Sequence, residues 1–185
     1  MASQTDGYAC TSLLLARSQT LSTVLIDCPV FYSRLLPLKG KTVLGWGRKW
    51  SGRRAIALAA DHGRAFCLVE DGFLHSVGRD DPALSLVLDG SGIYYDCTEP
   101  SDLEIRAQEP LSQDEIVQAR RVMALWRAQR LSKYNAERDV AGPLPDHYIL
   151  LCDQTFGDAS ISHGTADAGN FTRMLQAALT EYPEH

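Results

Sequence analysis

Short apolar runs alternate with amphipathic stretches along most of this chain. Runs at residues 42–44 and 65–69 predict buried strands. Between them, apolar or uncharged residues recur at the spacing of one helix face, at Ala55, Leu58, Ala59 and His62. Gly63 then follows as a C-cap. The pattern predicts a strand, a helix beginning near Ser51, and a second strand.

The second half of the chain continues this alternation. Ser112 and Glu115 have the spacing of a capping box, which predicts a long helix running to about Arg130. The apolar run at 149–152 predicts a buried strand, and helical spacing of apolar residues over 171–179 predicts a closing helix that packs on the sheet. Strands alternating with helices indicate an α/β fold, with a Rossmann-like, mostly parallel sheet.

Two segments are less regular. Residues 84–88 and 93–95 flank Asp89-Gly90-Ser91-Gly92, which predicts a hairpin-like turn. Residues 21–26 fit either a strand or a helical turn, and both interpretations stay open.

Composition limits the function more than the fold. The chain has 185 residues, 45% of them apolar, which suits one core. Its net charge of -5 argues against nucleic-acid binding, which needs a basic face. The five scattered cysteines lack zinc spacing and suggest reduced, cytoplasmic thiols. Because no apolar run approaches the roughly 20 residues that span a bilayer, we expect a soluble protein.

Carboxylates follow two of the predicted strands. Glu70 and Asp71 end one of them, and Asp153 and Asp158 follow the other. Neighbouring parallel strands deliver their ends to one edge of a sheet, and paired carboxylates are the usual apparatus of glycosyl chemistry. Simpler interpretations are an acidic turn at Glu70-Asp71 and a loop Asp153 that caps the next helix or bonds its own backbone.

The loop after the first strand contains Gly45 and Gly47, which invites a dinucleotide-binding hypothesis. The third glycine of that fingerprint would fall at Trp50, so an NAD-type oxidoreductase is a weak alternative that a cofactor titration decides. The loop and the following helix also carry several cations that suit an anionic ligand: Arg48, Lys49, Arg53 and Arg54.

Six ordered segments carry a family resemblance. They are Gly45-Trp46-Gly47-Arg48-Lys49, residues 70–78, residues 84–89, Gly92-Ile93-Tyr94-Tyr95-Asp96, Ser132-Lys133-Tyr134-Asn135, and residues 153–158. In sequence, order and spacing they resemble the bacterial capsule polysaccharide β-Kdo glycosyltransferases of the KpsC type. The resemblance runs from about Val43 to the C-terminus. It divides the chain into a weakly matched segment, 1–40, and a Rossmann-like acceptor-side domain, 41–185.

The resemblance implies a GT-B enzyme that transfers Kdo, an acidic eight-carbon sugar, from CMP-Kdo to a lipid-linked oligo-Kdo acceptor with retention of configuration. It implies no cofactor and no metal, a cytoplasmic location with peripheral contact to the inner membrane, and capsule assembly proteins as partners. The family's Lys-x-His-Pro nucleotide-binding segment would lie beyond the closing helix. The chain therefore corresponds to the first half of a GT-B module with the second Rossmann domain missing, and we expect little turnover from it alone.

The resemblance also implies roles for individual residues. Asp153 is the first choice for a nucleophile that forms a sugar–enzyme intermediate, and Asp158 is the rival. Glu70 or Asp71 would activate the acceptor hydroxyl. Other positions would contact the substrate: Arg48, Lys49, His75, Ser76, Lys133, Tyr134, Asn135 and Gln154. Since the family usually has Arg where this chain has His75, anion binding there would weaken near neutral pH. A non-catalytic module that binds acidic glycans is the alternative function.

Overall fold

The structure is a computed structural model that describes residues 7–35, 37–78, 81–136 and 142–184. Its five strands are β1 (Tyr8–Cys10), β2 (Val30–Phe31), β3 (Thr42–Trp46), β4 (Ala65–Asp71) and β5 (Leu86–Asp89). They form one sheet in the order β2-β1-β3-β4-β5, parallel except for β5, which runs antiparallel to β4. The predicted α/β fold with a mostly parallel sheet is confirmed.

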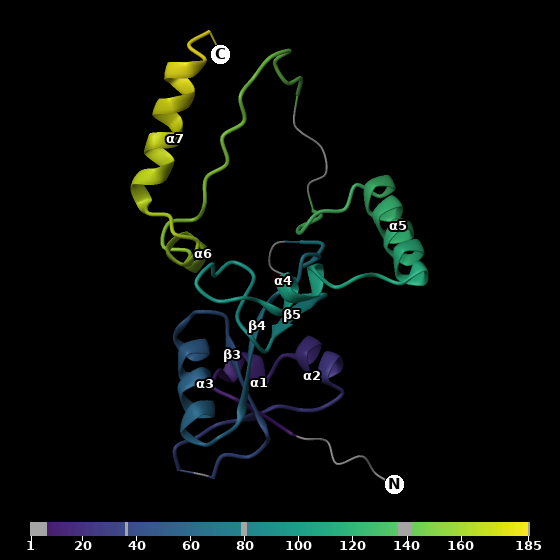
Figure 1. The fold of residues 1–185 in the computed structure, drawn as a ribbon, viewed down its shortest axis with the longest axis vertical. Coiled ribbons are helices and arrows are strands. Elements are labelled where there is room, and N and C mark those ends of the chain that lie inside the picture. Colours follow the sequence, from purple (N-terminus) through teal and green to yellow (C-terminus); the bar gives the residue numbers. More distant parts are fainter. Residues whose placement is uncertain (1–6, 36, 79–80, 137–141, 185) are drawn as a thin grey trace.

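Seven helices accompany the sheet in the described residues. They are α1 (Leu13–Ala16), α2 (Gln19–Leu25), α3 (Trp50–Asp61), α4 (Asp102–Ala107), α5 (Gln113–Ala128), α6 (Ala159–His163) and α7 (Ala168–Glu181). The segment that sequence left undecided, residues 21–26, thus lies mostly in a helix. Figure 1 shows β3 and β4 between α3 and the α1–α2 pair, with α5 and α7 projecting away from the sheet.

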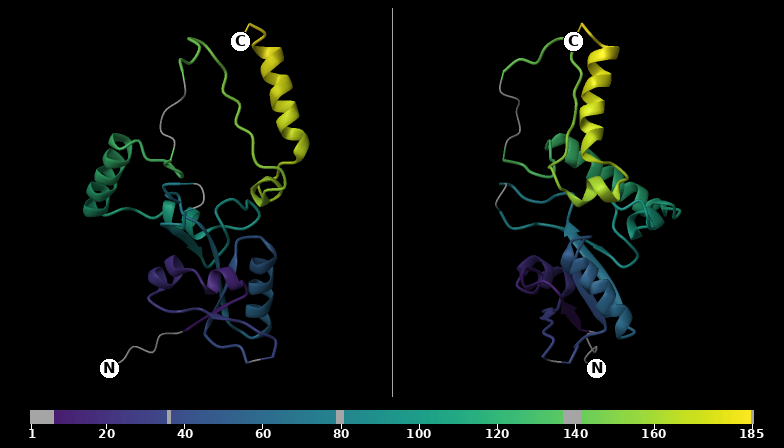
Figure 2. Two further views of the ribbon diagram at one scale, coloured as in Figure 1. Left: turned by 180° about the vertical axis from the view of Figure 1, so that it is seen from behind. Right: turned by 90° about the vertical axis from the view of Figure 1, so that its left-hand side faces the viewer.

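The core lies on both faces of the sheet because side chains alternate along β3. Val43 packs with Ala55 and Ala59 of α3, whereas Leu44 packs with Leu15 and other residues of the α1–α2 side. All of these side chains are almost fully buried. The two further views place α3 and the α1–α2 pair on opposite sides of the strands (Figure 2). The predicted strand, helix and strand over residues 42–69 are confirmed.

Two glycines allow α3 to start directly against the end of β3. A Cβ on Gly45 would lie 2.4 Å from the Ser51 carbonyl oxygen and 2.6 Å from the Gly52 Cα. A Cβ on Gly52 would lie 1.6 Å from the Gly47 carbonyl oxygen. Gly45 and Gly52 therefore bring two backbones together, which explains Gly45 without a bound dinucleotide.

The N-terminal segment contributes a strand inside the sheet. β1 pairs with β3 on one side and with β2 on the other. Ala9 and Cys10 are buried. The Thr11 hydroxyl just beyond them donates to the Ser51 carbonyl over 2.7 Å and lies 3.1 Å from the Leu44 carbonyl oxygen. Residues 8–31 therefore complete the same sheet as residues 42–89.

The predicted hairpin around Asp89 is wrong. Residues 86–89 form β5, but residues 93–95 form a turn and not a returning strand. The buried Asp89 carboxylate accepts from the backbone N–H groups of Ser91, Gly92 and Asp102. It thereby turns the chain out of the sheet and fixes the start of α4, a role that local turn propensity does not reveal.

The predicted strand at residues 149–152 is also wrong. These residues have no regular secondary structure, and Leu150 is 74% exposed. The closing helix α7 exists where predicted, but none of its residues is buried, so it does not pack on the sheet. Figure 1 shows α7 projecting at the end of the molecule opposite to β3. Apolar content alone suggested burial, but the described residues place no element over this segment.

Helix α5 confirms the predicted capping box and length. Ser112 accepts from the Glu115 backbone N–H, and the Glu115 carboxylate accepts from the Ser112 N–H. None of its residues is buried, and Met123 is 52% exposed. None of the helices described here is long and apolar enough to cross a bilayer.

Candidate active site

A polar cavity of about 520 Å³ lies beyond the ends of β3 and β4. Its wall combines the end of β4, the turn after β3, the turn before α4 and two later loops. The residues that line it are Lys49, Glu70, Asp71, Tyr94, Tyr95, Lys133, Tyr134, Gln154, Gly157, Asp158, Ala159 and Ser160. Seven of them were predicted from sequence as site residues: Lys49, Glu70, Asp71, Lys133, Tyr134, Gln154 and Asp158. We call this space the polar cavity.

Glu70 is held on β4 by a short hydrogen-bond chain. The Tyr95 hydroxyl donates to Glu70 Oε1 over 3.0 Å and accepts from the Arg48 backbone N–H over 2.9 Å. Burial raises the pKa of Glu70, although the bond from Tyr95 and the charge of Lys49 oppose that effect. Burial also raises the pKa of Tyr95, so this hydroxyl keeps its proton for Glu70. The result is a fixed carboxyl group with an increased tendency to hold a proton.

Asp158 enters the cavity from the loop before α6. Its Oδ1 accepts from the Ser160 backbone N–H over 2.8 Å, which makes it the N-cap of α6. The hydrogen bonds from Ser160 lower the pKa of Asp158, and the charges of Lys49 and Lys133 lower it further. The cavity therefore pairs a carboxylate that ionises easily with Glu70, whose pKa moves in the opposite direction.

Contacts around Asp96 attach the α6 segment to the sheet. The Cys97 backbone N–H donates to the His163 carbonyl over 3.1 Å, and His163 Nδ1 lies 3.4 Å from Asp96 Oδ2. The same buried Asp96 forms an ion pair with Arg48. Arg48 does not line the polar cavity, so the structure places this predicted anion-binding cation in a structural pair.

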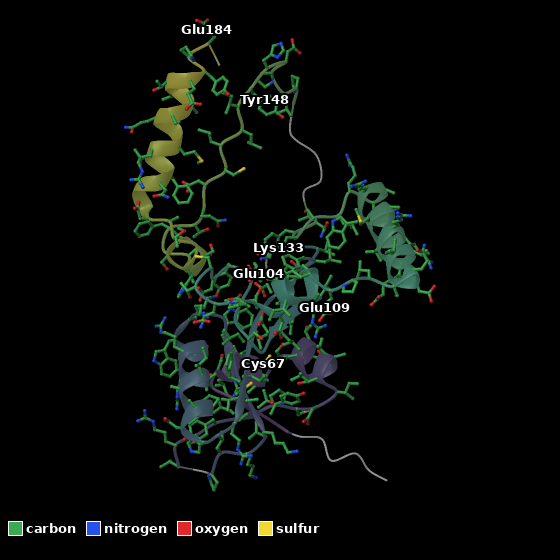
Figure 3. The ribbon with its side chains drawn as sticks, viewed as in Figure 1. Cys67, Glu104, Glu109, Lys133, Tyr148 and Glu184 are labelled. Atoms are coloured by element: carbon green, nitrogen blue, oxygen red, sulfur yellow. The ribbon has the colours of Figure 1, made fainter. Side chains whose placement is uncertain are left out.

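Lys133 and Tyr134 reach the cavity through the folding of their own turn. Asn135 accepts from the Ser132 N–H and donates from its side chain to the Ser132 and Ser76 carbonyls. Both Asn135 and Ser76 are buried. These two predicted substrate contacts therefore hold the turn in place and do not line the cavity. Figure 3 shows Lys133 where the sheet region meets the projecting segments.

Asp153, the first choice for the nucleophile, does not line the polar cavity. It is exposed, and its Oδ1 accepts from the backbone N–H of Gln154. Its expected position depended on a strand at 149–152 that the structure lacks, so no strand end directs it towards Glu70. The simpler hypothesis of a loop Asp bonded to its own backbone describes it correctly.

A larger cavity of about 1010 Å³ adjoins the polar cavity, and Lys49 and Asp71 line both. Its other walls come from the α1–α2 segment, Trp46, His75 and residues 82–86. Arg17 also lines it. His75 is a candidate from the sequence, but nothing in the sequence indicates that the N-terminal helices contribute to a cavity. We call it the larger cavity.

Tyr94 and Tyr95 were not predicted as site residues, although both lie in the Gly92–Asp96 motif. A tyrosine pair beside a glycine-rich turn is a weak signal, and only the fold shows that Tyr95 meets Glu70 from β4. Among the residues whose placement is given, no group of three or more His, Cys, Asp or Glu side chains could hold a metal ion.

Comparison with known proteins identifies related chains. The family described as "Capsule polysaccharide biosynthesis protein" matches residues 41–144. The capsule polysaccharide modification protein LipA of Neisseria meningitidis serogroup B is 38% identical over 175 residues, covering 89% of this chain and 24% of LipA. The lipopolysaccharide-processing protein LpsZ of Rhizobium meliloti is 37% identical over 126 residues, covering 63% of this chain and 29% of LpsZ. The chain thus spans about a quarter of these curated relatives.

Two solved structures share the fold. The KpsC β-Kdo 2,4 transferase of Thermosulfurimonas dismutans superposes with a TM-score of 0.79 at 34% identity, covering 96% of this chain and 58% of that one. The KpsC β-Kdo 2,7 transferase of the same organism gives a TM-score of 0.63 at 25% identity, covering 96% of this chain and 57% of that one. The likeness therefore includes the N-terminal strands as well as residues 41–144.

Proposed function

Because the chain belongs to the family of capsule polysaccharide biosynthesis proteins, we propose that it is the acceptor-side half of a retaining transferase. This transferase moves Kdo from CMP-Kdo to a lipid-linked oligo-Kdo acceptor. The 34% identity to a β-Kdo 2,4 transferase supports Kdo as the transferred sugar. The chain covers 58% of that structure, so the complete reaction requires a complete module.

One observation carries the proposal. The polar cavity holds two carboxyl groups whose surroundings move their pKa values in opposite directions, with two lysines beside them. A difference in pKa between two neighbouring carboxyl groups allows an enzyme to use one for nucleophilic attack and the other for proton transfer. Asp158, with its lowered pKa, is the nucleophile, and Glu70, with its raised pKa, is the base.

The reaction runs in two displacements. In the first, an Asp158 oxygen attacks the anomeric carbon of Kdo, the bond to the phosphate breaks, and CMP leaves with the electron pair. In the second, the acceptor hydroxyl oxygen attacks the same carbon, its proton passes to Glu70, and the bond to Asp158 breaks. Two inversions retain the configuration.

Two lysines are placed to attract the negative charges of the substrates. Lys49 and Lys133 line the cavity with both carboxylates, where they attract the carboxylate of Kdo and the phosphate of CMP. Lys49 Nζ also lies 5.6 Å from the centroid of the Trp46 ring, a cation–π contact that helps to position the ammonium group. GT-B transfer needs no metal, because side chains and helix ends receive the charge of the leaving phosphate.

The test is to trap the intermediate on Asp158. Residues 1–185 are joined to the part of the Thermosulfurimonas transferase that they do not cover, incubated with CMP-Kdo, and analysed for a sugar adduct by fragmentation mass spectrometry. Asp158→Asn should abolish the adduct while keeping the cap of α6, because Asn caps a helix as well as Asp does. Asp153→Asn is the matched control and should retain it. An adduct that Asp153→Asn removes and Asp158→Asn keeps would reverse the assignment.

Binding without transfer would favour the alternative function. A non-catalytic module for acidic glycans would bind an oligo-Kdo acceptor equally well in the wild type and in Asp158→Asn. It would also form no adduct in the joined module. Acceptor binding by calorimetry, compared with the adduct assay, separates the two functions.

A further inference from the structure

Asp96 is a buried carboxylate at which three segments of the chain meet. Its Oδ1 accepts from the Thr98 backbone N–H over 3.0 Å and from the Thr98 hydroxyl over 2.6 Å. Its Oδ2 forms the ion pair with Arg48 and lies 3.4 Å from His163 Nδ1. Each oxygen therefore has two partners, and Asp96 lines neither the polar cavity nor the larger cavity. A carboxylate in this position acts through its neighbours and not by touching a substrate.

Asp96 is ionised at neutral pH. Burial opposes its ionisation, but the hydrogen bonds from Thr98 and the charge of Arg48 outweigh this effect and lower the pKa of the carboxyl. The Arg48 side chain is 15% exposed. Removal of the Asp96 charge would leave this guanidinium without its partner in a mostly buried place, which is unfavourable. The ion pair is therefore a strong restraint on the turn that contains Arg48.

On one side, the contacts of Asp96 lead to Glu70. Arg48 lies in the turn after β3, and its backbone N–H donates to the Tyr95 hydroxyl over 2.9 Å. That hydroxyl donates in turn to Glu70 Oε1 over 3.0 Å. Because Asp96 holds the Arg48 side chain, it also helps to fix the peptide that binds Tyr95. Glu70 is thus linked to Asp96 through two residues.

On the other side, the contacts of Asp96 lead to Asp158. His163 is the last residue of α6, and Asp158 is the N-cap of the same helix. The backbone N–H and the thiol of Cys97 both lie 3.1 Å from the His163 carbonyl oxygen. None of the five residues of α6 is buried, so these polar contacts at its last residue restrain the helix more than packing does. Since the helix is only about 8 Å long, a shift of His163 would displace Asp158 as well.

We propose that Asp96 is a positioning residue, which sets the separation between Asp158 and Glu70 by binding Arg48 and His163 at the same time. This inference rests on the proposed function for the roles of Asp158 and Glu70, and on the contacts above for the geometry. It gives Arg48 a role different from the substrate contact that the family resemblance implied. The strand wall and the loop wall of the polar cavity are thereby joined through one buried carboxylate.

A shift of α6 should slow the reaction more than it weakens donor binding. Asp158 must lie next to the anomeric carbon, and a misplacement of about 1 Å can lower a rate about 100-fold. Lys49 and Lys133 still line the polar cavity and bind CMP-Kdo. In the joined module, Asp96→Asn should therefore lower kcat for Kdo transfer about 100-fold and change KM for CMP-Kdo little. His163→Ala removes only the ring contact at a side chain that is 31% exposed, so it should fold and show a smaller loss of kcat.

Asp89→Asn is the matched control for a loss of stability. Asp89 is also a buried aspartate that accepts from backbone N–H groups, but these belong to Ser91, Gly92 and Asp102, outside α6 and outside the turn after β3. Asp89→Asn should therefore lose stability and keep the wild-type kcat. Equal losses of kcat in Asp96→Asn and Asp89→Asn would overturn the proposal.

Substitutions of Arg48 distinguish positioning from substrate binding. Arg48→Lys keeps a charge that faces Asp96, so it should recover most of the kcat that Arg48→Gln loses. Arg48→Gln should leave KM for CMP-Kdo nearly unchanged, because Arg48 does not line the polar cavity. A higher KM with an unchanged kcat in Arg48→Gln would make Arg48 a substrate contact and would contradict the positioning role.

The geometry is tested separately, without any need for transfer activity. In ¹⁵N-labelled chain 1–185, Asp96→Asn should speed hydrogen exchange at the Cys97 and Ser160 amides about tenfold, because the attachment of α6 opens more often. Amides shared between β3 and β4 should keep their wild-type rates. Unchanged exchange at Cys97 and Ser160 would overturn the proposal, whatever the adduct assay shows. Faster exchange there, with no adduct in the wild-type joined module, would confirm that Asp96 holds α6 and would refute the proposed function instead.

Discussion

Gly47→Ala is the substitution that tests the geometry of the polar cavity most directly. Gly47 has φ of +36°, a region that alanine rarely adopts. A Cβ there would lie 2.0 Å from Glu70 Oε1 and 2.3 Å from the Tyr95 hydroxyl oxygen. The side chains of both residues would have to move, and the hydrogen bond between them would be lost.

The expected loss of stability has two parts. Forcing alanine into the left-handed region costs about 1–2 kcal/mol. Loss of the Glu70–Tyr95 hydrogen bond and the Arg48–Tyr95 hydrogen bond costs about 1 kcal/mol each. We therefore expect Gly47→Ala to lower the free energy of unfolding by about 3–4 kcal/mol.

Gly63→Ala is the matched control. Gly63 has φ of +60°, and a Cβ there would meet nothing within 4 Å. It should lose only the backbone part, about 1–2 kcal/mol. Urea unfolding followed by circular dichroism measures both variants against the wild type. Equal losses in the two variants would refute the claim that the Gly47 site is closed by Glu70 and Tyr95.

Two further substitutions test groups that the fold brings together. Tyr95→Phe removes a donor to Glu70, so the already raised pKa of that carboxyl should rise further, as read from its ¹³C signal in a pH titration. Protonated Glu70 stabilises the fold fully below the pKa of Glu70 in the unfolded chain, and this contribution is lost as the pH rises through the pKa of Glu70 in the folded protein. In Tyr95→Phe the contribution should therefore persist to higher pH. An unchanged titration of Glu70 would contradict the hydrogen bond. Asp89→Asn replaces one of two accepting oxygens with a donor and should cost about 1–3 kcal/mol in urea unfolding. A neutral effect would show that these buried N–H groups find other partners.

The elements that sequence predicted well are those with local causes. β3, α3 and β4 follow from two apolar runs and one helical repeat, and each contacts its neighbours in the chain. Helix α5 follows from a capping box that needs only residues three apart, Ser112 and Glu115. In these cases the pattern and the partner both lie within a few tens of residues.

The failures have non-local causes. The run at 149–152 is apolar enough for a strand, but strand formation needs a neighbour with free backbone groups, and both edges of the sheet lie elsewhere. β1 has only three residues, and it occupies an interior position of the sheet because β2 and β3 pair with it. Neither outcome can be read from local hydrophobicity.

The site divides in the same way between a strand wall and a loop wall. Glu70 pairs with Val87 in the β4–β5 ladder, so its backbone is fixed by the sheet, and sequence placed it correctly at a strand end. Asp158 reaches the same cavity through a loop that Cys97 and His163 attach to the sheet. Its convergence with Glu70 could not be deduced from strand periodicity, because no strand delivers it. Substitutions that weaken this attachment should therefore alter the distance between the two carboxylates more than they alter the stability of the sheet.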